Sequence, residues 1–352
     1  MLVHICCSVD SHYFLQKIQK DYPDENIIAF FYDPNIHPYS EYKLRLLDVE
    51  YSCKLLNIPL IEGEYDIQTW FNKIKGFENE PEKGLRCNIC FERRLEVTAQ
   101  EAKKLKQHTF TTTLLMSPKK SQEKLKLIGN QLAKQYNLQF LFKDYRIGKG
   151  MQEQSQEVKK YNIYRQDYCG CMFALKAQRN MQNRLSDELF SPVNQQILPE
   201  SIEERIELYK NRKPTDILIK QRFLNYRLFS AKILIKQQVI PSYFLCYSTL
   251  KNNKSNGKIE KIIDNIGYFV RDEIKFITLD YFNKLSNKNY KTILELAFNP
   301  LTFEDELQIR YKIVDNCYDL STIIVVDHFS TDKYTIFCNS QIYEDVKTIV
   351  KK

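Results

Sequence analysis

The chain has 352 residues, 43% of them hydrophobic and 27% charged, and its formal net charge is +8. This composition is ordinary for a globular protein, and the length is sufficient for two domains, while repeats and low-complexity tracts are absent from the sequence. Neither a run of about 18 apolar residues nor a secretory leader pattern is present, so we expect a cytoplasmic protein without membrane contact.

The first half alternates between strand and helix patterns. Apolar, β-branched runs predict strands at 1–5, 26–32, 58–61, 109–116 and 138–142. Helical spacing predicts helices at 11–22, 39–57, 66–74, 88–106, 119–136, 151–161 and 172–184. Ser11 is the expected N-cap of the first helix. The alternation predicts an α/β fold with a doubly wound parallel sheet over residues 1–185.

The predicted topology also indicates where a ligand would bind. In a doubly wound sheet the first strand lies beside the strand that starts the second half, and ligands bind at the carboxyl ends of these strands. Here the two ends are followed by Cys6-Cys7 and by Ser117-Pro118-Lys119-Lys120. We therefore expect the cysteine turn and the basic segment to share one cleft.

The second half has a different pattern. A linker is expected around Ser191-Pro192 and Leu198-Pro199, and residues 202–238 are predicted to be mostly helical with a break at Lys213-Pro214. The apolar runs at 323–329 and 334–339 predict a hairpin. We expect residues 186–352 to form an additional C-terminal α+β domain, whose role the sequence does not indicate.

The ten cysteines are distributed unevenly. Four stand alone among apolar neighbours and are interpreted as buried thiols, namely Cys53, Cys246, Cys317 and Cys338. The other six form the close pairs Cys6/Cys7, Cys87/Cys90 and Cys169/Cys171. In a cytoplasmic protein, paired cysteines indicate metal ligands or catalysts rather than disulfides.

Each pair can direct two thiols at one site. Cys6 and Cys7 follow a strand, with the carboxylate of Asp10 three residues further on. Cys87 and Cys90 share a helix face, and the helix N-terminus favours their thiolates. In Cys169-Gly170-Cys171, glycine gives the backbone room to turn around a bulky centre.

The number of ligands restricts the chemistry. Six thiols and one carboxylate exceed the four ligands of a tetrahedral zinc site. They could form one four-thiolate site with two spare thiols, or hold an iron–sulfur cluster beside a second metal. A dithiol redox catalyst needs a single pair and does not account for three.

Five segments in the order of the chain, HICCSVD, FYDPNIHPYSEY, RCNICFERRL, TTTLLMSPKK and YRQDYCGCMFAL, resemble the QueH family of epoxyqueuosine reductases. The resemblance extends to about residue 185. It implies a fold similar to the PP-loop (HUP-like) nucleotide-binding domains. It also implies a cobalamin-independent oxidoreductase that reduces epoxyqueuosine to queuosine at the wobble position of tRNA, with electrons from an unidentified donor.

The resemblance further implies a [4Fe-4S] cluster and a nearby mononuclear iron. The implied metal ligands are Cys6, Cys7, Asp10, Cys87, Cys90, Cys169 and Cys171, without an assignment of each cysteine to one metal. Asp10 then belongs to the catalytic iron, which would polarise the epoxide oxygen.

Further residues are candidates for contacts with the substrate. Tyr164, Arg165 and Tyr168 lie beside the last cysteine pair and could donate a proton or stack on the nucleoside; packing around the turn is the alternative. His37, in a loop between prolines, could line the cleft, whereas His4 is expected in the core.

The basic segment suggests contacts with RNA. From Glu101 to Gly150 there are eleven Lys and Arg against three Asp and Glu, which fits either an RNA footprint or a solvated helix face. The candidates for phosphate contacts are Arg93, Arg94, Lys119 and Lys120.

Two other functions stay open. One is a zinc-stabilised tRNA-binding module without redox activity, and the other is a tRNA thiolation enzyme that uses ATP. The first turn reads CCSVD and lacks the glycine that a phosphate loop needs for close backbone approach, so we expect no ATP site there.

Overall fold

The computed structural model describes residues 1–118, 120–190, 195–269, 273–314 and 319–351. The chain divides into two compact units. The first contains Met1–Leu189, Arg205–Leu218 and Val350–Lys352, and the second contains Phe190–Glu204 and Ile219–Ile349. The segment Arg205–Leu218 therefore belongs with the sheet of the first half although it follows that half in sequence.

The first unit is built on a parallel sheet of five strands in the order β3-β2-β1-β4-β5. The strands are β1 (Leu2–Ile5), β2 (Ile28–Phe31), β3 (Leu60–Glu62), β4 (Thr109–Thr112) and β5 (Gln139–Phe140). The expected α/β class and the doubly wound sheet are confirmed, and β1 lies beside β4 as the topology rule requires.

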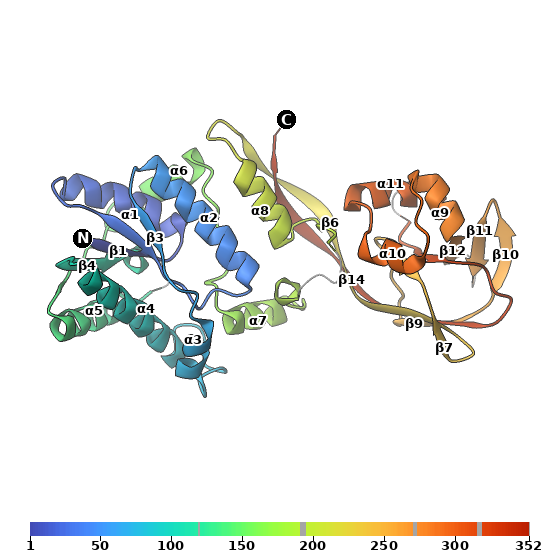
Figure 1. Cartoon of the computed structure of the whole chain (residues 1–352), viewed down its shortest axis with the longest axis horizontal. Coiled ribbons are helices and arrows are strands. Elements are labelled where there is room, and N and C mark those ends of the chain that lie inside the picture. The colour runs from blue at the N-terminus through green and yellow to red at the C-terminus, as the bar shows by residue number, and fades with distance from the viewer. Residues whose placement is uncertain (119, 191–194, 270–272, 315–318, 352) are drawn as a thin grey trace. The chain divides into compact units, whose positions relative to one another are not determined.

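Helices cover both faces of this sheet. The helices of the first half are α1 (Ser8–Asp21), α2 (Tyr39–Leu55), α3 (Ile67–Ile74), α4 (Leu85–Lys104), α5 (Gln122–Tyr136), α6 (Gly150–Lys160) and α7 (Met172–Met181), and α8 (Ile202–Asn211) follows them. α1 packs with α2 and α6 on one face, and α4 packs with α5 on the other (Figure 1). This change of face between β1 and β4 opens the crevice of a doubly wound fold.

The central strand β1 has the sequence LVHI, and all four side chains are fully buried. Apolar side chains on both faces are typical of a parallel strand covered by helices on each side. His4 is satisfied there, with Nδ1 2.8 Å from Thr112 Oγ1 and Nε2 3.2 Å from the Tyr32 carbonyl. The expectation of a core histidine is confirmed.

Two predicted boundaries are wrong. The first helix begins at Ser8 with Cys7 in extended conformation as its N-cap, so Ser11 is not the cap. The strand predicted at 109–116 ends at Thr112, and Thr113–Met116 form a 3₁₀ turn, η1. The reason is local, because the Thr112 hydroxyl accepts a hydrogen bond from the Leu114 amide and caps the turn.

The second unit contains two sheets, with strand orders β10-β11-β12-β13-β8 and β7-β6-β14-β9. Their strands are β6 (Leu218–Ile235), β7 (Gln238–Ile240), β8 (Tyr243–Phe244), β9 (Lys254–Gly257), β10 (Ile259–Ile263), β11 (Ile266–Phe269), β12 (Ile274–Thr278), β13 (Thr322–Val326) and β14 (Tyr334–Val350). The helices α9 (Leu279–Ser286), α10 (Ile293–Phe298) and α11 (Phe303–Ile313) accompany them. Among the pairings described, those of β10 with β11, β11 with β12, β13 with β8, β14 with β9 and β6 with β7 are antiparallel, and that of β12 with β13 is parallel.

Two expectations for this half are wrong. The helix predicted over 202–238 ends at Asn211, and most of the remainder is the 18-residue strand β6. The runs at 323–329 and 334–339 do not form a hairpin, because β13 and β14 belong to different sheets. Across the described part of the chain, no helix is long and apolar enough to cross a membrane.

Candidate metal centre

A cavity of about 260 Å³ lies at the carboxyl ends of β1 and β4. All seven predicted metal ligands line it: Cys6, Cys7, Asp10, Cys87, Cys90, Cys169 and Cys171. Ser117, Pro118 and Lys120 line the same cavity. The predicted sharing of one cleft by the cysteine turn and the basic segment is therefore confirmed.

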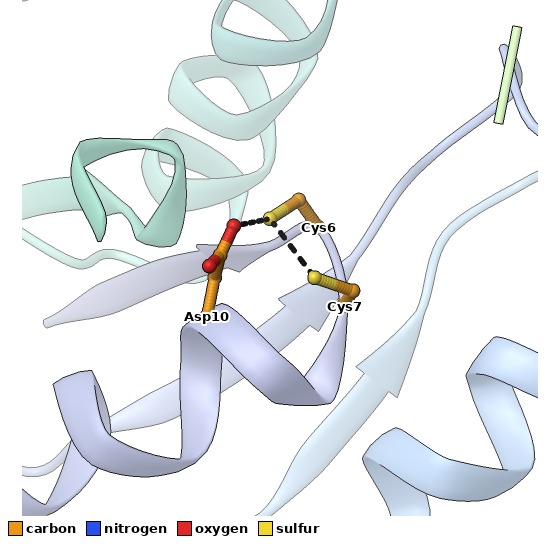
Figure 2. Close-up of side chains that lie close together, drawn as sticks. All are labelled: Cys6, Cys7 and Asp10. Atoms are coloured by element: carbon orange, nitrogen blue, oxygen red, sulfur yellow. Dashed lines mark hydrogen bonds between the residues drawn. The ribbon is translucent and has the colours of Figure 1, made fainter. Parts of the chain in front are cut away.

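The tightest group of ligands comes from the turn between β1 and α1 (Figure 2). The Sγ atoms of Cys6 and Cys7 are 3.8 Å apart, and Cys6 Sγ is 3.6 Å from Asp10 Oδ2. The ligand atoms of these three residues all lie within 4.8 Å of one another. That spacing suits one metal ion.

The local structure orients each member of this group. The Cys6 amide donates to Thr113 Oγ1 at 3.1 Å, which ties the end of β1 to η1. Asp10 lies in the first turn of α1, and its Oδ1 accepts a hydrogen bond from Gln154 Nε2 at 3.1 Å. Asp10 is not the N-cap, because Cys7 holds that position.

The second pair lies in the first turns of α4. Cys90 is buried and Cys87 is half-buried, and the Lys83 amide donates to Cys87 Sγ at 3.2 Å. Cys90 packs in one buried cluster with Cys169, Cys171 and Trp70. The helix pair and the C-G-C pair therefore converge.

The C-G-C turn is held by main-chain and side-chain hydrogen bonds. Arg45 donates to the carbonyls of Tyr168 at 3.1 Å and Cys169 at 3.2 Å. The His37 amide donates to the Gly170 carbonyl at 2.8 Å, and the Tyr168 hydroxyl donates to the His37 carbonyl. Gly170 has φ +106°, a conformation that favours glycine.

Four of the candidate ligands resist ionisation. The hydrogen bond with Cys7 and then burial raise the pKa of Cys6 well above its usual range. Burial raises the pKa values of Cys90 and Asp10, and burial together with the neighbouring Cys169 raises the pKa of Cys171 to about 12. A bound cation reverses this balance, since metal ligation stabilises the deprotonated ligands.

The structure separates the predicted substrate residues into two groups. Arg94, Lys120, Arg165 and Tyr168 line the cavity. Of these, Arg94 is buried and forms a salt bridge with Asp33, so its charge faces the protein interior as well as the thiols. Lys119 lies outside the described residues.

His37, Arg93 and Tyr164 are not among the residues that line the cavity. The His37 ring packs against Trp70 and Phe71, with centroids 5.2 Å apart, and burial lowers its pKa to about 4. Arg93 pairs with Asp66 at 2.7 Å. Tyr164 is buried, and its hydroxyl lies 3.2 Å from both carboxylate oxygens of Glu41.

Sequence reasoning missed several residues of the site. Arg45, Trp70, Asn35 and Arg86 also line the cavity. Glu41 and Arg45, four positions apart on a predicted helix, form a buried salt bridge of 2.8 Å, and that spacing was the available signal. Asn35 Oδ1 is buried without a hydrogen-bond partner among the described residues, which leaves a free acceptor at the cavity.

Comparisons with known proteins agree on one family. The family described as "Epoxyqueuosine reductase QueH" matches residues 1–177. The chain is 38% identical to the epoxyqueuosine reductase QueH of Helicobacter pylori, over 99% of both chains. It is 35% identical to the QueH of Thermotoga maritima, over 53% of this chain and 95% of that protein.

Among solved structures, a predicted subunit of tRNA methyltransferase from Methanocaldococcus jannaschii matches 55% of this chain and 94% of its own. The sequence identity is 14% and the TM-score is 0.35. Since the family match covers half of the chain and the H. pylori relative matches nearly all of it, this chain belongs to the QueH family of epoxyqueuosine reductases.

Proposed function

We propose that this protein reduces epoxyqueuosine to queuosine in tRNA, using a [4Fe-4S] cluster and an adjacent mononuclear iron. The observation that carries the proposal is the convergence of six thiols and one carboxylate on a single cavity in a member of this family. Thiolates are the ordinary ligands of iron–sulfur clusters, and a carboxylate suits a harder ion.

The geometry supports a division of the ligands between the two metals. Cys6, Cys7 and Asp10 are close enough together to hold one ion, so we assign them to the mononuclear iron. This leaves four thiols, the number that a [4Fe-4S] cluster requires, from Cys87, Cys90, Cys169 and Cys171. Two of these thiols lie in α4 and two lie in the C-G-C turn. A cluster would bind between these two segments and connect them.

When bound, the metals would supply Lewis-acid and single-electron chemistry. Conversion of the epoxide to the alkene consumes two electrons and two protons and releases the oxygen as water. The electrons come from an external low-potential donor.

The protein's own side chains bind and orient the substrate. Arg165 is exposed at the rim of the cavity, and Lys120 lies half-buried with its ammonium 5.1 Å from the centre of the Phe91 ring. Both can contact phosphate, which positions RNA without reading its sequence. Tyr168 has its hydroxyl bound to the His37 carbonyl, so only its ring is available to the nucleoside.

The other predicted residues take supporting roles in this proposal. Arg93 and His37 shape the walls behind the cavity through Asp66 and Trp70, respectively. Tyr164 contacts Glu41 rather than the cavity.

One assay tests the proposed function. Protein reconstituted anaerobically with iron and sulfide is incubated with tRNA that contains epoxyqueuosine and a low-potential reductant, and the nucleosides are then analysed. We expect queuosine in amounts that exceed the enzyme, and none when iron is replaced by zinc. Iron-loaded protein that binds the tRNA without forming queuosine would contradict the proposal and favour the binding module.

A further inference from the structure

We propose that Arg205 is a positioning residue for the Cys169-Gly170-Cys171 turn, acting through Tyr164, Glu41 and Arg45. Arg205 lies on α8, beyond the residues that match the family, yet it belongs to the first unit. The inference rests on the proposed function only in treating Cys169 and Cys171 as metal ligands.

The contacts form a continuous series. Arg205 donates from an Nη atom to the Tyr164 hydroxyl at 2.9 Å. That hydroxyl lies 3.2 Å from both carboxylate oxygens of Glu41. Glu41 accepts a hydrogen bond from Arg45 Nε at 2.8 Å.

Arg45 completes the series at the turn. With Nε bound to Glu41, its two Nη atoms point at the carbonyls of Tyr168 and Cys169. A guanidinium is planar, so fixing Nε against a carboxylate also fixes the direction of both Nη donors. The side chain of Glu41 therefore determines where Arg45 holds the turn.

Arg205 determines which partner receives the hydroxyl proton of Tyr164. The phenol has one proton, and a guanidinium can only donate hydrogen bonds. Because the Tyr164 oxygen accepts from Arg205, the phenol cannot donate to that partner and directs its proton to Glu41. Glu41, Arg45 and Tyr164 are all buried, so a misdirected hydroxyl cannot exchange its lost bond for water.

The same segment also fixes the main chain of Tyr164. Arg212, seven residues after Arg205, forms a buried salt bridge with Asp48. Asp48 Oδ2 accepts a hydrogen bond from the Tyr164 amide at 3.1 Å. Both ends of Tyr164, its amide and its hydroxyl, are thus held through arginines of residues 205–218.

The test measures the turn itself rather than turnover. In metal-free protein, the rate at which iodoacetamide alkylates the half-buried Cys169 is followed by peptide mass spectrometry. We expect Arg205→Met to raise this rate about tenfold, since it removes a charge-assisted hydrogen bond from a buried network. Arg205→Lys, which retains a cation, restores part of the protection.

The matched control is Lys210→Met, a cation exposed on the same helix, which leaves the alkylation rate of Cys169 unchanged. A double-mutant cycle adds the mechanism: in a Tyr164→Phe background, Arg205→Met has no further effect, because the phenol oxygen that connects it to Glu41 is gone. Additive effects in this cycle would contradict the series.

The outcomes are separable from those of the proposed function. If wild-type protein does not form queuosine, the proposed function fails, but the alkylation experiment still decides the role of Arg205. If Arg205→Met lowers the melting temperature and leaves Cys169 as protected as in the wild type, Arg205 only docks α8, and the positioning role is overturned. In reconstituted protein, we expect Arg205→Met to shift the midpoint potential and the electron paramagnetic resonance signal of the cluster.

Discussion

Gly170 shows how closely the structure restricts one residue of the candidate metal centre. A Cβ atom at this position would lie 2.8 Å from the Ile36 side chain and 3.2 Å from Arg45 Nη1, and the φ of +106° is unfavourable for any side chain. The turn between the two cysteines therefore requires glycine for its conformation and for its close packing.

We expect Gly170→Ala to destabilise the protein by about 1–3 kcal/mol through backbone strain. The reconstituted variant should also contain much less iron and sulfide than the wild type. The free energy of unfolding and the metal content of reconstituted protein check this. Gly76→Ala is the matched control, because Gly76 also has a positive φ of +88° but a Cβ atom there would meet nothing within 4 Å. The Gly76→Ala variant should lose stability without losing metal. Equal metal loss in the two variants would contradict a specific requirement for glycine in the C-G-C turn.

Asp10 allows a second test at a single residue. Asp10→Asn preserves the shape of the side chain and removes its negative charge. Because Cys7 is the N-cap of α1, we expect the helix to be unaffected. The variant should keep its sulfide, lose about one iron and lose nearly all turnover, since a neutral amide is a poor ligand for a hard cation.

Two measurements check these effects: the iron and sulfide content of the variant, and the amount of queuosine that it forms. Asp24→Asn, at an exposed position, serves as the control with full iron content. Wild-type activity and iron content in Asp10→Asn would show that the carboxylate is not a ligand.

The convergence of the seven candidate ligands on one cavity could be predicted from sequence, whereas the residues that hold their turns could not. Cys87 and Cys90 are i and i+3 on a helix, and Cys6, Cys7 and Asp10 follow one strand, so local spacing was informative. Arg45 contacts Cys169 across 124 positions, and Arg205 contacts Tyr164 across 41. No local pattern identifies such partners, because they depend on tertiary packing.

At the level of elements, the connection from η1 to α5 brings a positive charge to the cavity. Lys120 lies there beside Phe91, near the ligands of both proposed metals. We expect Lys120→Ala to weaken tRNA binding and to lower the slope of log K against log salt by about one, with the cluster retained. Fluorescence anisotropy at several salt concentrations measures this. Lys134→Ala, exposed near the end of α5, is the control, and an identical salt dependence for both variants and the wild type would argue against phosphate contact at Lys120.

The elements of the second unit show where sequence patterns mislead. Residues 218–235 contain apolar residues at spacings that fit a helix, but they form β6, which is paired with β14. Strand preference depends on the partner strand and on burial, and β14 lies far along the chain, at Tyr334–Val350. The alternating first half was more predictable because its inner parallel strands, β1, β2 and β4, are nearly continuous buried runs.

At the level of the whole molecule, buried neutral histidines make stability depend on pH. Burial lowers the pKa of His12 and of His37 to about 4, and burial together with Arg94 lowers the pKa of His4 well below its usual value. The unfolded chain takes up protons below about pH 6.5, while the folded chain does not. The contribution of these histidines to stability is therefore complete above about pH 6.5 and is lost as the pH falls toward 4. The buried carboxyls of Asp33 and Asp48, whose pKa values burial raises to about 7 and about 6, oppose this loss.

We expect each of these histidines to lower the free energy of unfolding of metal-free protein by up to about 3 kcal/mol across this window, before the opposing effect of the carboxyls is added. Urea titrations at a series of pH values measure the slope. His12→Gln should flatten it, and His108→Gln, at an exposed position, should leave it unchanged. A slope that is the same in His12→Gln and the wild type would refute the linkage.

The position of β1 at the centre of the sheet has a consequence for the order in which the proposed metal centre would be assembled and lost. Cys6 and Cys7 follow this strand directly, and central strands open only when a domain unfolds, whereas loops open locally. We therefore expect the half of the proposed centre formed by Cys6, Cys7 and Asp10 to be preformed as soon as the sheet folds, and the half that includes the C-G-C turn to open locally around an incoming cluster. We expect oxygen to reach the proposed cluster through the half that includes the C-G-C turn. During exposure to air, the protein should therefore release sulfide before it loses its last iron.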